Sequence, residues 1–211
     1  MDELFTLQLL HAADQEAGID AVEAAPNFSA VLNALEDDFE NTVILSSGDA
    51  YIPSPFFFAS EEVFGGQGRG DILIQNELGF QAIAFGNHEF DLGTGLVADL
   101  ISSDEADYPG TKFPYLSANL DFSTDENLAP LVVADGQEAD TIPNSISSNT
   151  IMDLNGESIG VVGATTATLP SISSPGDVIV NPIEFDSSDP EDIAALSRLK
   201  MGAEFAIVLV R

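Results

Sequence analysis

Short apolar runs alternate along the first half of the chain with segments of helical spacing. Four of these runs have the length of buried strands. They cover residues 6–10, 42–46, 82–85 and 115–118. After Pro26 and Asn27, which are typical helix-start residues, apolar side chains recur at intervals of three and four as far as Phe39. Further helices are predicted at 72–78 and around 96–101.

The second half of the chain is more polar until a hairpin restores the strand pattern. Residues 121–149 are acidic and loop-like. The apolar segments 150–154 and 158–163 flank an Asn-Gly pair, which suits a type I′ turn, and they predict a β-hairpin. A helix at 189–202 and a last strand at 205–210 follow. Strands that alternate with helices favour an α/β fold with much parallel pairing.

Length and composition fit one globular domain. The chain has 211 residues and is 45% hydrophobic, which is enough for a packed core. It has no cysteine, so disulfides and thiolate metal sites are excluded. The chain starts with neither a basic segment nor a long apolar run, so no signal peptide is expected within it. No apolar stretch approaches the length of a membrane span.

The net charge is strongly negative. There are 36 acidic residues against 5 lysines and arginines, for a formal charge of −31. Such a surface repels nucleic-acid polymers and anionic membranes, so neither is an expected partner. An anionic small molecule would need local cations, and metal ions can supply them. The same acidity also suits a protein that stays soluble in salty surroundings, where repulsion is screened.

Polar residues follow three predicted strands. Asp14, Asp49 and Asn87 each come just after an apolar run. In parallel sheets the carboxyl ends of the strands meet at one edge, so these side chains are expected to converge there. Glu16 is two residues after Asp14 and can face the same side in an extended segment. Carboxylate and amide oxygens are ligands for hard metal ions, and two ions that share a carboxylate can activate a hydroxide.

A histidine and an aspartate stand next to these candidate ligands. His88 directly follows Asn87 and adds an imidazole beside the predicted metal site. It could stabilise charge on a phosphoryl group or protonate a leaving oxygen. Asp91 is three residues further on, and a carboxylate can orient the imidazole ring.

Five segments resemble a known enzyme family in the same order. GNHEFD at 86–91 resembles the signature of the calcineurin-like metallophosphoesterases. LLHAADQEAG at 9–18 resembles the first motif of the 5′-nucleotidase branch, and SSGDAYIPSPFF at 46–57 resembles its Gly-Asp motif with a following aromatic. LSANL at 116–120 and IGVVGATT at 159–166 also have counterparts there. The resemblance covers nearly the whole chain.

The resemblance implies a fold, an activity and a set of roles. The fold would be a sandwich of two sheets flanked by helices, and the activity would be hydrolysis of phosphate monoesters, with nucleotides favoured. Asp14 would bind the first of two divalent ions, Asp49 would bridge both, and Asn87 would bind the second. His88 and Asp91 would form the catalytic pair. The metals could be zinc, manganese, calcium, magnesium or iron, and the family implies a location outside the cytoplasm.

The chain departs from the family pattern in two ways. The family usually has histidine where Glu16 stands. The carboxylate of Glu16 favours a harder ion than zinc. Gln15 is the competing ligand if the register differs by one. The family also has further metal-binding histidines after the strand equivalent to 205–210, and a separate C-terminal substrate domain. Here only His11 and His88 are present, and His11 matches a structural position.

These departures set the expected activity and its alternatives. Residues 1–211 are expected to form an N-terminal metallophosphoesterase domain that is incomplete at its C-terminus and weak or inactive alone. One alternative is a non-catalytic metal-binding or structural remnant of the family. Another is an acidic, salt-adapted binding module in which the motif is vestigial.

Overall fold

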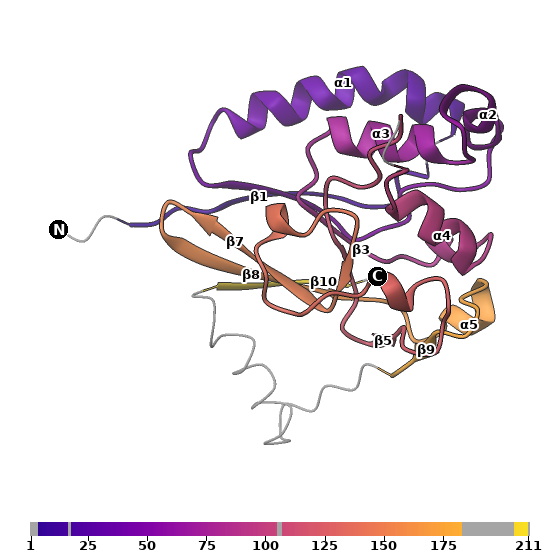
Figure 1. Cartoon of the computed structure of the whole chain (residues 1–211). Helices are drawn as coiled ribbons and strands as arrows, with labels where there is room; N and C mark the ends of the chain where they lie inside the picture. Colours follow the sequence, from indigo (N-terminus) through magenta and orange to yellow (C-terminus); the bar gives the residue numbers. More distant parts are fainter. Residues whose placement is uncertain (1–3, 17, 105–106, 183–204, 211) are drawn as a thin grey trace.

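Two β-sheets lie face to face in a computed structural model of the chain, and helices cover the outer face of the larger sheet (Figure 1). The structure describes residues 4–16, 18–104, 107–182 and 205–210. The α/β class predicted from the alternation of strands and helices is confirmed, as is a parallel sheet flanked by helices. The predicted helix at 189–202 lies outside the described residues.

Parallel pairing joins all the strands of the larger sheet that the structure describes. Their order is β1 (Gln8–Ala12), β2 (Thr42–Ser46), β3 (Ala82–Ala84), β4 (Tyr115–Leu116) and β6 (Ile146–Ser147). Ala12 pairs with Ser46, and Ser46 pairs with Ile83. The carboxyl ends of the first three strands therefore meet at one edge of the sheet, where active sites of such sheets form.

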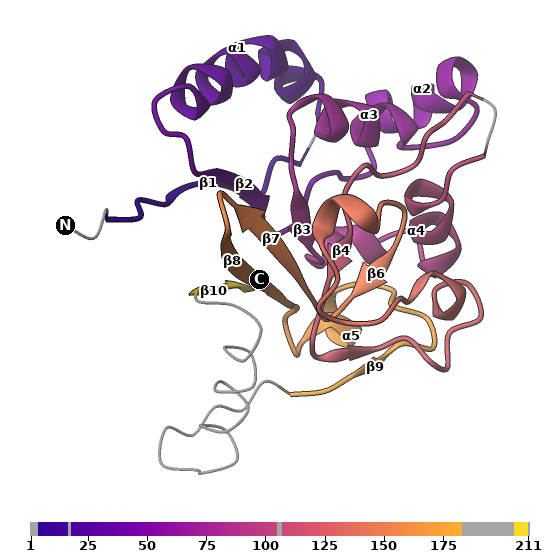
Figure 2. The ribbon, with the colours of Figure 1, turned by 60° about the vertical axis from the view of Figure 1, so that its left-hand side comes forward.

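The second sheet is built on the predicted hairpin. Its strands are β7 (Asn149–Leu154), β8 (Glu157–Ala164) and β10 (Phe205–Val210), with β7 antiparallel and β10 parallel to β8. Asn155 and Gly156 in the turn have φ angles of 56° and 91°. Positive φ at both positions is the requirement of a type I′ turn, so the Asn-Gly pair directs the chain back along itself. Figure 2 shows β7, β8 and β10 side by side.

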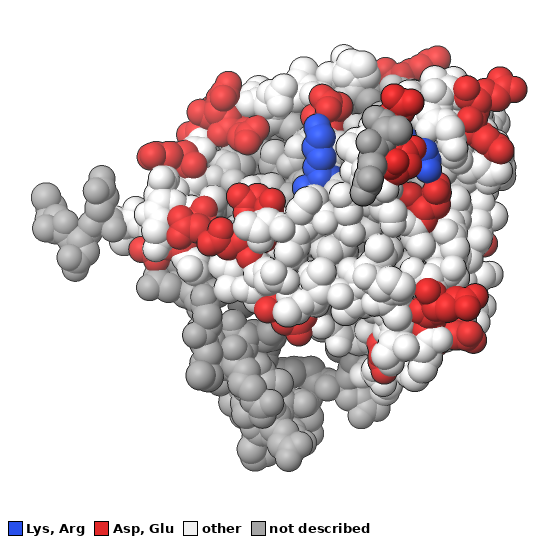
Figure 3. Space-filling view, in the orientation of Figure 1, with Lys and Arg blue, Asp and Glu red and all other residues white. Residues whose placement is uncertain are grey.

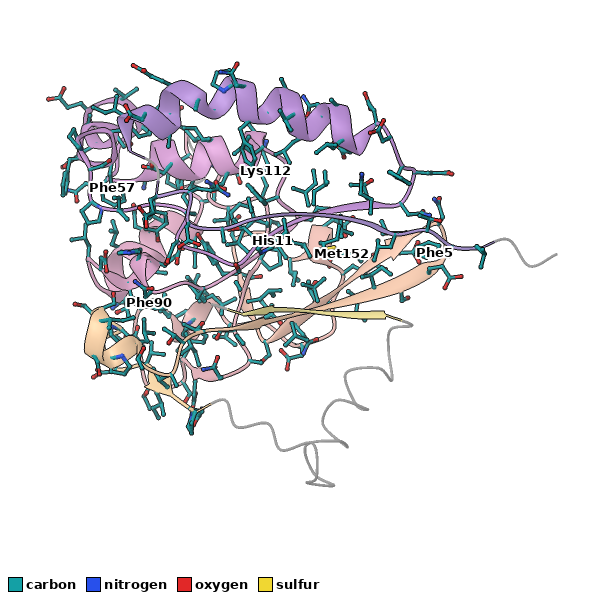
Figure 4. The ribbon with its side chains drawn as sticks, turned by 180° about the vertical axis from the view of Figure 1, so that it is seen from behind. Phe5, His11, Phe57, Phe90, Lys112 and Met152 are labelled. Carbon is teal, nitrogen blue, oxygen red and sulfur yellow. The ribbon has the colours of Figure 1, made fainter. Side chains whose placement is uncertain are left out.

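Alternation along β2 divides the core into two layers. Val43 and Leu45 pack in one cluster with Met152 of β7 in the second sheet, and Phe5 packs against this cluster. Figure 4 labels Met152 and Phe5. Ile44 faces the opposite way, into the layer between the sheet and the helices. Successive side chains of a strand point to opposite faces, so one apolar run fills both layers.

The helices connect successive strands of the larger sheet. They are α1 (Ile19–Glu36), α2 (Pro55–Phe64), α3 (Arg69–Glu77) and α4 (Thr94–Ile101), whereas the short α5 (Leu169–Ile172) follows β8 of the second sheet. Short 3₁₀ turns and a small two-stranded ribbon complete the described elements. These are η1 (His88–Phe90), η2 (Ala129–Leu131), η3 (Ala139–Thr141), β5 (Leu120–Asp121) and β9 (Ile179–Val180).

The first helix was predicted to begin in the wrong place. It begins at Ile19, so Pro26 lies inside it rather than at its start. Proline removes one backbone donor, but the alanine-rich sequence around it favours helix strongly enough to continue. The pattern also did not reveal α2, whose start is marked by Ser54, which accepts the Phe57 N–H at 3.2 Å. Gly65, with φ of 75°, ends that helix.

Phe85, directly after β3, fills the layer between the sheet and the helices. It is fully buried and stacks on Tyr115 with ring centroids 4.5 Å apart. Phe85→Ala should lower the free energy of unfolding by about 3–5 kcal/mol, because the ring leaves a cavity that the sheet cannot close. Phe58→Ala is the control, since Phe58 is 48% exposed on α2, and it should cost under about 1 kcal/mol. Urea unfolding followed by circular dichroism measures both, and equal losses would contradict this account of the core.

Candidate active site

The loops after β1 and β2 run side by side at the carboxyl edge of the sheet. The backbone N–H of Asp14 donates to the carbonyl of Gly48 at 3.2 Å, and that of Glu16 donates to the carbonyl of Asp49 at 3.0 Å. The predicted ligands of the first two loops are therefore held by backbone hydrogen bonds between the loops. Asn87 follows the neighbouring strand β3, at the same edge.

Backbone strain is concentrated in these loops. Asp14, Glu16 and Asp49 have φ angles of 53°, 48° and 51°, a region of backbone conformation that non-glycine residues rarely adopt. Gly48 has φ of 96°, and a Cβ there would lie 2.3 Å from the backbone nitrogen of Gly86. Only glycine permits this contact between the loops after β2 and β3. Strained backbone persists where the surroundings enforce it, and it clusters at functional sites.

The carboxyl group of Asp49 is buried against the third loop. Asp49 is fully buried, and its Oδ1 accepts the backbone N–H of His88 at 2.8 Å. Burial raises the pKa of Asp49, while hydrogen bonds from the backbone of His88 and Asn87 lower it in part. The charge of Glu16 raises the same pKa further. Asp49 is therefore a carboxylate that a bound cation would stabilise.

Glu89 joins the loops after β2 and β3 through one buried carboxyl group. Its Oε1 accepts the N–H of Ala50 at 2.9 Å, and its Oε2 accepts those of Asp49 at 3.1 Å and Gly86 at 2.8 Å. Burial raises the pKa of Glu89 to about 7. The folded state holds this proton more tightly than the unfolded chain does, so ionisation costs stability as the pH rises from about 4.5 to about 7.

His88 and Asp91 form a pair at the rim of the same edge. The Nδ1 of His88 lies 2.7 Å from Oδ2 of Asp91, and the Oδ1 of Asp91 accepts the hydroxyl of Ser173 at 3.0 Å. A carboxylate only accepts, so the proton of this pair lies on Nδ1 when Asp91 is ionised. Burial lowers the pKa of His88, but the hydrogen bond and charge of Asp91, with the charges of Asp49 and Glu16, outweigh it and leave the pKa raised.

The predicted metal ligands lie in one region of the molecule without forming a compact metal cluster. Glu16 acts electrostatically on both Asp49 and His88, which places these three groups in one neighbourhood. Within the described residues, however, no three histidine, aspartate or glutamate side chains converge closely enough to hold a metal ion. The remaining oxygen ligands of the predicted set are Asp14, in the loop after β1, and Asn87, which directly precedes the 3₁₀ turn η1.

Sequence reasoning missed the residues that support the site. Glu89 was noted only as a letter of the GNHEFD segment, although an acidic residue four positions after a predicted buried strand could have suggested a buried acceptor. Ser173 was not identified, because 82 residues separate it from Asp91 and no local pattern links them. His11, which was expected to be structural, lies on β1 with its Nε2 3.2 Å from the hydroxyl of Ser47 (Figure 4).

Removal of Glu89 should separate the two loops. Glu89→Ala leaves three buried N–H donors without their acceptor, and each such donor costs about 1–3 kcal/mol, so a loss of about 3 kcal/mol or more is expected. Glu62→Ala is the control, because Glu62 is exposed on α2, and it should change stability by less than about 0.5 kcal/mol. Urea unfolding at pH 8 measures both variants. A Glu89→Ala protein as stable as the Glu62→Ala protein would show that the carboxyl group does not join the loops.

Comparison with known proteins connects this geometry to one family. No protein-family model matches the chain. The chain is 28% identical over 192 residues to the trifunctional nucleotide phosphoesterase protein YfkN of Bacillus subtilis, a match that covers 85% of the chain and 12% of that protein. It is 32% identical over 152 residues to the 5′-nucleotidase of Mus musculus, across 72% of the chain and 22% of that enzyme. The chain therefore spans less than a quarter of the length of either relative.

A solved structure shares the fold over almost the whole chain. The 5′-nucleotidase precursor from Thermus thermophilus superposes with a TM-score of 0.67 and 23% sequence identity, over 98% of this chain and 37% of that one. This likeness shows the fold, and the sequence relatives show the kinship. The chain belongs to the 5′-nucleotidase family of metallophosphoesterases.

Proposed function

We propose that the chain contributes to metal-dependent hydrolysis of phosphate monoesters, with nucleotides as favoured substrates. The observation that carries the proposal is the meeting of the loops that bear Asp14, Asp49 and Asn87 at one edge of the parallel sheet, beside the His88–Asp91 pair. The printed names of the relatives, nucleotide phosphoesterase and 5′-nucleotidase, favour the same reaction class.

Two divalent ions are the cofactors that this arrangement would use. Asp14 and Glu16 would hold the first ion, Asp49 would bridge both, and Asn87 would hold the second. Such ions would activate a water molecule and neutralise charge on the phosphoryl group. All four side chains donate oxygen, which favours a hard ion such as magnesium, manganese or calcium over zinc.

His88 would act on the substrate through its Nε2 atom. The Nδ1 of His88 is hydrogen-bonded to Asp91 at 2.7 Å, and Asp91 accepts a hydrogen bond from Ser173. These two bonds fix the orientation of the imidazole ring. The raised pKa keeps a larger share of His88 protonated near neutral pH. In that form Nε2 can donate a proton to the leaving oxygen of the ester or a hydrogen bond to a phosphoryl oxygen.

The charge distribution explains why this reaction would need metal ions. Arg69 and Lys112 are the arginine and lysine within the described residues, and both are already paired with carboxylates. Figure 3 shows acidic side chains spread over the visible face with little blue among them. A phosphate dianion would meet a field set by a net charge of −31, and metal ions at Asp49 would supply the local positive charge.

The incomplete ligand set also limits the rate that we propose for the isolated chain. With no three acidic or histidine side chains converging in the described residues, water would fill most coordination positions. Water does not fix geometry, and a misplacement of about 1 Å can cost on the order of 100-fold in rate. We therefore propose weak activity. The alternative, a non-catalytic metal-binding or structural remnant, predicts metal binding without turnover.

We also propose that the chain acts outside the cytoplasm on a small-molecule ester. Two of its relatives are named snake venom 5′-nucleotidases, and these are 27% identical to it. No helix in the described part of the chain is long and apolar enough to cross a bilayer.

The test combines metal titration with an activity assay. Manganese binding is measured by calorimetry, and hydrolysis of a nucleoside monophosphate and of p-nitrophenyl phosphate is followed with manganese present. We expect weak binding that Asp49→Asn lowers at least about tenfold, and slow turnover, well below the typical rate of about 10 s⁻¹, that His88→Ala abolishes. Asp37→Asn, an exposed residue at the end of α1, should change neither quantity.

Each alternative has its own result in these assays. Metal binding that depends on Asp49, without hydrolysis that depends on His88, would support the remnant. Absence of metal binding would contradict the proposed function. Turnover near about 10 s⁻¹ would show that the chain completes the site by itself and that the incomplete-ligand argument is wrong.

A further inference from the structure

A cavity lies between helices α1 and α3 at the carboxyl end of β1. Its volume is about 320 Å³, within the range of small-molecule sites. Most of its wall is apolar, including Ala12, Val22, Ala25, Phe28, Ile74 and Leu78. The polar part of the wall comes from Asp14, Gln15, Asp71 and Gln75. A small molecule with an apolar body and a polar head would match this division.

The acidic group in the wall is buried and unpaired. Asp71 on α3 is fully buried, and neither oxygen of its carboxyl group has a hydrogen-bond partner. The nearest cation along the helix, Arg69, is held by Asp99 and Asp104 at 3.0 and 2.8 Å. Burial raises the pKa of Asp71 to about 7. A buried carboxyl group without donors costs free energy, and a donor or cation from a ligand would remove that cost.

Gln75 adds a second unpaired acceptor one helical turn from Asp71. Its Nε2 donates to the Oε1 of Gln15 at 2.7 Å, while its own Oε1 is buried without a donor. Residues four apart lie on the same face of a helix, so the Asp71 and Gln75 acceptors both line this cavity. Together they provide three acceptor oxygens that lack N–H donors, and the Nε2 of Gln15 in the same wall is a buried donor without an acceptor.

We propose that this cavity binds a small organic cation, whose ammonium or amidinium head donates to Asp71 and Gln75 and whose apolar body packs against α1. A charged N–H donor would satisfy the unpaired acceptors by charge-assisted hydrogen bonds. The apolar wall from α1 and Leu78 would exclude water from the body of the ligand. The surrounding charge of −31 would also attract a cation.

A bare metal ion fits this cavity poorly. Hard cations take about six to eight oxygen ligands at short distances, and the wall offers few oxygens in a space far larger than an ion. An anion or a neutral hydrocarbon would leave the Asp71 carboxyl group unpaired. The inference does not require the proposed hydrolysis, because its acceptors Asp71 and Gln75 are on α3, although Asp14, a proposed metal ligand, also lines the cavity. Gln15 lies between Asp14 and Glu16, so an occupant would contact the loop that bears these residues.

Calorimetric titration with benzylammonium tests the proposal directly. The experiment uses the full chain at pH 8, above the raised pKa of Asp71, in about 1 M sodium chloride, where the Debye length is about 3 Å and surface attraction is screened. We expect saturable binding of one equivalent. Benzyl alcohol, which keeps the ring, and methylammonium, which keeps the charge, should each bind at least about tenfold more weakly.

Matched variants separate the cavity from the general acidity of the protein. Asp71→Asn keeps the size of the side chain and should weaken benzylammonium at least about tenfold, since it removes a charge-assisted hydrogen bond. Glu77→Gln removes the same charge from an exposed position on α3 and should leave binding within about twofold. Ala25→Leu should fill the apolar end and also weaken binding, while Ala30→Leu, exposed on α1, should not.

Thermal unfolding would confirm that each variant is folded before titration. The proposal would be overturned by any one of three results: no saturable binding of benzylammonium, equal effects of Asp71→Asn and Glu77→Gln, or methylammonium binding as tightly as benzylammonium. None of these outcomes depends on hydrolytic activity, so failure of this site and failure of the proposed function are distinguishable.

Discussion

One buried carboxyl group, that of Glu89, holds the candidate site together. It accepts N–H groups from the loops after β2 and β3, and Asp49, which it orients through the backbone, in turn accepts the N–H of His88. The close approach of Gly48 to Gly86 leaves no room for a side chain between the two loops. Without the carboxyl group of Glu89, three buried N–H donors would lack an acceptor, which would lower the free energy of unfolding. The positions of the metal-binding and catalytic candidates therefore depend on a residue with neither role.

The site and the surface use negative charge in different ways. Over the whole chain, 36 acidic residues against 5 basic ones give a net charge of −31, which repels anions and attracts cations. At the sheet edge, Asp49 and Glu89 are buried, and hydrogen bonds from backbone N–H groups partly offset the cost of burying their carboxyl groups. Salt does not screen these buried hydrogen bonds. Asp71 is buried without such compensation. Because Asp49 and Glu89 accept backbone hydrogen bonds and Asp71 accepts none, we place the first two in the candidate active site and propose that Asp71 binds a ligand.

The sequence predicted much of this arrangement because the relevant signals are local. The apolar run at Thr42–Ser46 became β2 with the same bounds, and the Asn-Gly turn gave the hairpin of β7 and β8. The start of α1 was missed because Pro26 is a start signal in isolation, whereas the alanines around it sustain the helix. Glu89 and Asp71 could not be predicted as they stand, because burial and partners depend on contacts with residues far away in the sequence. The roles of Asp14, Glu16, Asp49, Asn87, His88 and Asp91 remain proposals that rest on their placement.

The central claim is that the loops joined by Glu89 present Asp49 to a metal ion. The most direct measurement is anomalous diffraction from crystals of the chain soaked in manganese chloride. The account predicts an anomalous peak at about 2.0–2.6 Å from an oxygen of Asp49, the distance range of hard cations, with Asp14 or Asn87 as a further neighbour. The peak should vanish in Asp49→Asn crystals. Well-ordered wild-type crystals with manganese bound only at surface carboxylates, and none at Asp49, would contradict the account.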